Sequence, residues 1–167
     1  MNMFTEKLAP EIASYYRNLA LGHGVVPKIF TLVNAQSEQY LFFLDDLNLD
    51  QEAESDFLAY IVNEHDAITY ARGTLVVLED EMRQLIEFAV IDKEDTNTIV
   101  CSAELTIDAD EKPVQVSEFK KIFAPASTVF FSGLYEPVQL SPEQIEEYSA
   151  LWEEMKPKIL HRYMLEQ

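Results

Sequence analysis

Residues 67–107 read AITYARGTLVVLEDEMRQLIEFAVIDKEDTNTIVCSAELTI, and the rest of the chain is organised around them. It holds three apolar runs, 67–78, 85–91 and 98–107, separated by acidic segments with turn-forming residues. The third run alternates apolar with polar residues, and its apolar members are Ile99, Cys101, Ala103, Leu105 and Ile107. This period of two is typical of a strand with one face in a core. The stretch therefore predicts a three-stranded antiparallel meander at the centre of the protein.

The residues before the meander predict a helix, a hairpin and a second helix. Residues 5–21 carry apolar side chains at helical spacing, with Pro10 expected in the first turn, where its missing N–H costs nothing. Residues 28–33 and 39–44 predict two strands joined by a turn. Because this hairpin is apolar on both faces, it needs a cover on each side. The second helix begins after Asp50, whose side chain suits the N-cap.

The residues after the meander predict one more strand, an irregular segment and a last helix. The strand is expected around 114–119. Segment 122–140 is apolar enough for a core but punctuated like a loop, so it either crosses the body of the protein or forms a contact surface. Ser141 begins the helix as the N-cap of a capping box closed by Gln144. The apolar side of this helix, which includes Trp152, suits packing on the sheet, and pairing with a copy of itself is the other interpretation.

The order of these elements, α-β-β-α-β-β-β-β-α, predicts one α+β domain over residues 1–167. Hairpin-length connections predict a mainly antiparallel sheet, built from a hairpin plus a three- to four-stranded meander. The N-terminal, central and C-terminal helices are expected to pack on this sheet, gathered over one face. A chain of 167 residues that is 48% apolar can bury a core of its own without disulfides.

Charge is the strongest signal in the composition. Lys and Arg number 12 against 30 Asp and Glu, for a formal net charge of −18. No Lys or Arg occurs between Lys28 and Arg72, or between Lys121 and Lys156. Such a field repels nucleic acid and anionic membranes, so neither is an expected partner, and a basic protein is favoured. Solubility alone is the other explanation of the charge.

Two sets of residues are the candidates for binding a partner. The first base-free block supplies an acidic set: Asp45, Asp46, Asp50, Glu52, Glu54 and Asp56. The later segment supplies an aromatic set: Phe130, Phe131 and Tyr135. Aromatic clusters with few charges are typical of interface centres, so the second set suits a homodimer, with burial in the protomer core as the alternative.

The sequence holds no catalytic or cofactor signature. Phosphate-loop patterns, a nucleophile elbow and the spacings of metal ligands are all lacking, so we expect no catalytic residue, cofactor or metal, and lean against an enzyme. Cys101 falls on the apolar side of its strand, which predicts a buried and unreactive thiol. No basic region followed by an apolar run opens the chain, and no apolar stretch is long enough to span a membrane, which favours the cytoplasm.

Three charged residues interrupt the apolar runs of the meander: Arg72, Glu87 and Glu104. With the second turn centred on residues 95 and 96, the two glutamates would lie opposite each other, and Arg72 on the neighbouring strand would neutralise them. An ion trio on the solvated face of the sheet is one interpretation. The other is a polar pocket for a small ligand, with Tyr70 nearby on the strand of Arg72.

Two classes of function follow from these observations. The first is a non-catalytic interaction or inhibitor-type protein that presents its negative surface to a basic partner. The second is a small-molecule-binding domain or an enzyme that uses the polar pocket around Arg72, Glu87 and Glu104.

Overall fold

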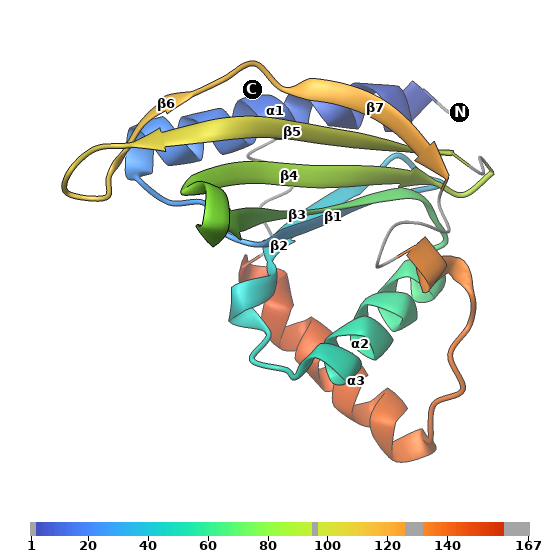
Figure 1. The fold of residues 1–167 in the computed structure, drawn as a ribbon. Helices are drawn as coiled ribbons and strands as arrows, with labels where there is room; N and C mark the ends of the chain where they lie inside the picture. The colour runs from blue at the N-terminus through green and yellow to red at the C-terminus, as the bar shows by residue number, and fades with distance from the viewer. Residues whose placement is uncertain (1–2, 95–96, 126–131, 159–167) are drawn as a thin grey trace.

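The computed structural model describes residues 3–94, 97–125 and 132–158, whose backbone forms one seven-stranded antiparallel sheet and three α-helices (Figure 1). The elements are α1 (Met3–His23), β1 (Ile29–Asn34), β2 (Gln39–Phe43), α2 (Gln51–Glu64), β3 (Ala67–Leu78), β4 (Arg83–Asp92), β5 (Asn97–Ile107), β6 (Pro113–Val116), β7 (Lys120–Pro125) and α3 (Pro142–Met155). The predicted single α+β domain is confirmed, and so are the hairpin and the meander of β3, β4 and β5.

The strands follow the order β2-β1-β3-β4-β5-β6, and β7 also pairs with β5. Strand β6 lies opposite residues 105–107 of β5, and β7 lies opposite residues 97–102. Both strands lie on the side of β5 away from β4, so they form the outer edge of the sheet in succession (Figure 1). Strand β7 corrects the prediction, which expected one further strand around 114–119 and then an irregular segment over 122–140 that either crosses the body of the protein or forms a contact surface.

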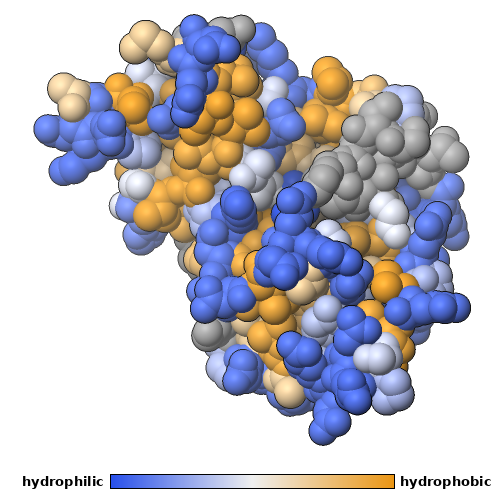
Figure 2. All heavy atoms as spheres, turned by 60° about the horizontal axis from the view of Figure 1, so that its bottom comes forward, coloured by the Kyte–Doolittle hydropathy of each residue, from blue (hydrophilic) through white to orange (hydrophobic). Residues whose placement is uncertain are grey.

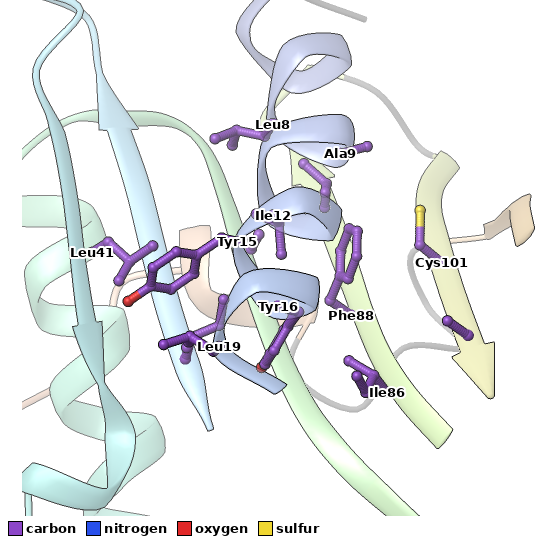
Figure 3. Close-up of a cluster of buried hydrophobic side chains, with 14 of the residues drawn as sticks. Leu8, Ala9, Ile12, Tyr15, Tyr16, Leu19, Leu41, Ile86, Phe88 and Cys101 are labelled. Atoms are coloured by element: carbon purple, nitrogen blue, oxygen red, sulfur yellow. The ribbon is translucent and has the colours of Figure 1, made fainter. Parts of the chain in front are cut away.

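The helices cover both faces of the sheet, which corrects the expectation of helices over one face. Helix α1 packs on one face, where its side chains gather with those of β4 and β5, including Phe88 and Cys101 (Figure 3). Helices α2 and α3 lie on the other face (Figure 1), where they pack against Phe30, Phe42 and Tyr70. The physical reason lies in the hairpin of β1 and β2, whose side chains are apolar on both faces and need two covers, as its sequence indicates.

Helix α1 begins at Met3, so Pro10 lies inside the helix rather than in its first turn. The prediction of its position was wrong, because burial of one helix face outweighs the hydrogen bond that proline cannot donate. Ile12 is fully buried in that face. At the start of the helix, the Thr5 hydroxyl donates a 2.8 Å hydrogen bond to the Asp92 carboxylate of β4.

The predicted helix starts are confirmed for α2 and α3. The Asp50 carboxylate accepts a hydrogen bond from the Ala53 N–H at 2.8 Å. The Ser141 hydroxyl accepts from the Gln144 N–H at 3.1 Å, and the Gln144 side chain accepts from the Ser141 N–H at 2.9 Å. The Trp152 ring of α3 packs among the rings of Tyr40, Phe42 and His65, which supports packing on the sheet rather than pairing with a second copy.

Candidate functional site

The two base-free blocks of the sequence meet as one layer of helices. The Phe57 and Tyr60 rings of α2 lie 5.8 and 6.2 Å from the Tyr148 ring of α3. Helix α2 carries Glu52, Glu54, Asp56 and Glu64, and helix α3 carries Glu143, Glu146, Glu147, Glu153 and Glu154. Neither helix contains Lys or Arg. We call α2, α3 and these carboxylates the acidic helical layer.

Tyr148 shows how closely the two helices bring their charges together. Burial raises the pKa of the Tyr148 hydroxyl, and the nearby carboxylates of Asp56, Glu147, Asp50 and Glu52 raise this pKa further. Since Glu147 belongs to α3 and the others belong to α2 or its N-cap, the negative charges of both helices act on one point.

The residues of the predicted acidic set lie in different parts of the structure. Asp45 and Asp46 are exposed in a short 3₁₀ turn after β2, where the Asp45 carboxylate accepts a 3.2 Å hydrogen bond from the Lys28 N–H. Asp50 caps α2, and Glu54 forms an ion pair with Arg72 of β3. Glu52 and Asp56 lie on the acidic helical layer. The glutamates of α3 were missed as site candidates. Their base-free run was the signal that pointed to them.

The predicted aromatic set is only partly described. Phe130 and Phe131 lie outside the described residues. Tyr135 is half-buried; its hydroxyl donates a 3.0 Å hydrogen bond to the Ile91 carbonyl, and its ring lies 4.9 Å from the Tyr70 ring. Tyr135 therefore contributes to the core, which is the alternative that the sequence left open.

Arg72, Glu87 and Glu104 share one face of the sheet with Tyr70. Arg72 lies opposite Ala89, and Glu87 lies opposite Ser102. Side chains of facing residues point to the same side, and those two residues apart along a strand do as well. This is the face that α2 and α3 partly cover.

The two glutamates are not opposite each other, which corrects the predicted register. Glu87 faces Ser102 and Glu104 faces Leu85, so the pairing of β4 with β5 is centred one residue earlier than expected. The observed register keeps two carboxylates from facing each other directly, an arrangement that would be repulsive.

Two charges of the predicted ion trio, those of Arg72 and Glu104, pair with residues outside the trio. Arg72 pairs with Glu54 of α2 at 3.3 Å, with both side chains largely buried. Glu104 pairs with Arg83 of β4, with both side chains about half exposed. The Arg72–Glu54 pair ties the acidic helical layer to the middle of the sheet.

Two open depressions lie on either side of the Arg83–Glu104 pair. One of about 520 Å³ is lined by residues that include Val77, Leu78 and Ile107, and one of about 550 Å³ by residues that include Leu85, Ser102 and Lys120. Apolar side chains gather on the sheet beyond the two helices in this region (Figure 2).

The four residues that were predicted to form a pocket do not come together in either depression. Glu104 borders both depressions, whereas Tyr70, Arg72 and Glu87 border neither. Tyr70 is fully buried, its ring stacks on Phe30 at 5.8 Å, and burial raises the pKa of its hydroxyl. The ligand-binding hypothesis stays a prediction.

Comparison with protein-family models, curated proteins and solved structures gave no match to this chain. In the described part of the chain, no helix is long and apolar enough to cross a membrane. In the same residues, no group of three or more His, Cys, Asp or Glu side chains is placed to hold a metal ion. The class of protein is therefore defined by the fold and the surface alone: it is an α+β protein with a curled antiparallel sheet and an acidic helical layer.

Proposed function

We propose that this protein is a non-catalytic interaction protein, of inhibitor type, that presents the acidic helical layer to a basic protein partner. One observation carries the proposal: the base-free blocks, far apart in the sequence, pack side by side as α2 and α3. We also propose a cytoplasmic setting, which suits a chain with a single buried cysteine.

The layer is suited to attract a partner by charge, because most of its carboxylates are exposed to solvent and act on a partner before any contact is made. Glu52, Glu146 and Glu147 are exposed, whereas Glu54 is already paired with Arg72. A surface of one sign speeds encounter with an oppositely charged protein, and this effect weakens as salt is added. The same surface repels phosphate backbones, so the partner is a protein rather than a nucleic acid.

The test compares two variants that remove the same number of negative charges. The layer variant carries Glu52→Gln, Asp56→Asn, Glu146→Gln and Glu147→Gln. The control variant carries Glu79→Gln, Asp80→Asn, Asp110→Asn and Glu118→Gln, which are exposed residues on the turns and edge of the sheet. Each protein is immobilised and incubated with native lysate at low ionic strength, and retained proteins are identified by mass spectrometry.

We expect the wild type and the control variant to retain a basic protein that the layer variant does not retain. Retention should fall when salt is added, because the attraction is screened. The proposal is wrong if the wild type retains no basic protein, or if both variants lose it equally, since bulk charge would then explain the binding.

A further inference from the structure

Strands β6 and β7 form an exposed edge of the sheet. Among the described strands, β7 pairs with β5 alone. Three large apolar side chains are more than half exposed along this edge: Val114 at 53%, Ile122 at 59% and Phe123 at 61%. An edge strand presents backbone N–H and C=O groups on its outer side, and exposed apolar side chains make it a template for another strand.

The opposite edge of the sheet is built differently. In β2, Gln39, Leu41 and Phe42 are buried, and Trp152 of α3 packs against the Phe42 ring. The chain thus buries side chains of β2 under its own helices, while it leaves apolar side chains of β7 in water.

We propose that β7 pairs in antiparallel orientation with β7 of a second copy of this chain, so that two sheets join into one. The two-fold axis of such a pair is perpendicular to the sheet and keeps each face on its own side. Residues that face each other across the two strands must point to the same face of the sheet. A residue of β7 can therefore face only its own copy, or a residue an even number of positions along the partner strand. The two strands are centred on Ile122 or on Phe123.

The sequence of β7, KKIFAP, is compatible with either centre. Centred on Ile122, the pair places Lys120 opposite Ala124 and Lys121 opposite Phe123. Centred on Phe123, it places Lys121 opposite Pro125 and Ile122 opposite Ala124. Lysines face no lysine in either register, so the strand is complementary to itself. Within one protomer, the Lys121 ammonium already lies 5.5 Å from the centre of the Phe123 ring.

Charge favours this edge as the place where two copies meet. Each chain carries a formal net charge of −18, so copies repel each other in general. Lys120 and Lys121 are adjacent bases on the edge, and they lower the negative potential where the strands would join. Because a strand of this length buries little surface, the dimer is expected to be weak and in rapid exchange with the monomer.

Salt separates this proposal from the proposed function. Added salt screens the repulsion between two acidic copies, so it should strengthen the dimer, whereas it should weaken binding of a basic partner. The dimer also leaves α2 and α3 uncovered, since they pack on one face of the sheet, against Phe30, Phe42 and Tyr70, and not beside β7. Either proposal can fail without the other.

The first experiment measures association of the full chain by analytical ultracentrifugation, from micromolar to millimolar concentration, at low and high salt. We expect a reversible monomer–dimer equilibrium that is stronger at high salt. Phe123→Lys and Ile122→Lys should each weaken it about tenfold or more, and Val114→Lys on β6 should leave it unchanged. Circular dichroism checks that all three variants are folded.

The second experiment finds the centre of the pair. Ile122→Cys or Phe123→Cys should form a covalent dimer under mild oxidation, and Val114→Cys should remain a monomer. A wild type that stays monomeric at every concentration and salt would overturn the proposal, since β7 would then be an edge that its lysines keep apart. Equal effects of Val114→Lys and Phe123→Lys would overturn it as well.

Discussion

Tyr16 of α1 lies directly against Gly73 of β3. A Cβ atom added to Gly73 would lie 2.5 Å from the phenolic oxygen of Tyr16 and 2.6 Å from its ring. The ring cannot move away easily, because its hydroxyl donates a 2.9 Å hydrogen bond to the Pro27 carbonyl and its side chain is fully buried. The absence of a side chain at Gly73 therefore sets how closely α1 approaches the sheet.

Gly73→Ala should destabilise the protein. The added methyl group forces the Tyr16 ring or the strand to shift, and overpacking of this kind costs about 1–3 kcal/mol. Urea unfolding followed by circular dichroism measures the loss. Gly22→Ala is the matched control, because a methyl group added at Gly22 would meet no atom within 4 Å and alanine favours the helix. Equal stability of the two variants would show that the Tyr16 contact does not limit the packing.

Ser141→Ala should weaken α3 and the acidic helical layer with it. The substitution removes the hydroxyl that accepts from the Gln144 N–H, and loss of such a cap costs about 1 kcal/mol. Ser149→Ala is the control, since Ser149 is exposed in the middle of the same helix and its change should stay within about 0.5 kcal/mol. The free energy of unfolding measures both. A Ser149→Ala loss as large as that of Ser141→Ala would contradict a specific role for the cap.

The elements that the sequence predicts well are those whose signals are local. The alternation of β5, and the polar caps Asp50 and Ser141, depend on neighbours within a few residues, and the structure confirms them. Strand β7 lacked such a signal. Ile122 and Phe123 are consecutive and both exposed, so no alternation of apolar and polar residues marks this strand, and its pairing with β5 is set by tertiary contact.

The candidate site was harder to predict than the fold, because it depends on distant contacts. Both base-free runs are visible in the sequence, but the packing of Phe57 on Tyr148 decides that they form one surface. The prediction that Glu87 and Glu104 face each other was wrong for a related reason. A turn displaced by one residue moves every facing pair by two, and the residues of a turn do not fix its centre so finely.

The Arg72–Glu54 pair should contribute more to stability than the Arg83–Glu104 pair. Their side chains are 15% and 16% exposed, against 48% and 55% for the second pair, so solvent screens the first pair less. A double-mutant cycle with Arg72→Met and Glu54→Gln should give a coupling energy of about 1–2 kcal/mol. The same cycle with Arg83→Met and Glu104→Gln should give less than about 1 kcal/mol. The reverse order would mean that exposure does not govern these pairs.

Cys101 should be almost inert to thiol reagents in the folded protein. Burial raises the pKa of the Cys101 thiol to about 11, and nearby Lys121 only partly offsets this effect. Relative to a thiol of ordinary pKa, the reactive thiolate is then about a hundredfold scarcer near neutral pH. Labelling by a thiol reagent should be at least that much slower in buffer than for the same protein in urea. Equally fast labelling in both would show that Cys101 is exposed.

Stability should fall at alkaline pH because of buried tyrosines. Burial raises the pKa values of Tyr16, Tyr70 and Tyr135 above their ordinary value, so the folded protein holds these phenolic protons more tightly than the unfolded chain does. The contribution of these tyrosines to stability is therefore complete below about pH 10, the ordinary pKa of tyrosine in the unfolded chain. It is lost as the pH rises through and beyond that value.

Urea unfolding at a series of pH values from neutral to about 11 measures this loss. Tyr70→Phe is the test variant, because it removes one titrating hydroxyl while keeping the ring between Phe30 and Tyr135. Its stability should decline less steeply with pH than that of the wild type, whatever its stability at neutral pH. If both decline with the same slope, Tyr70 does not hold its proton more tightly in the folded state.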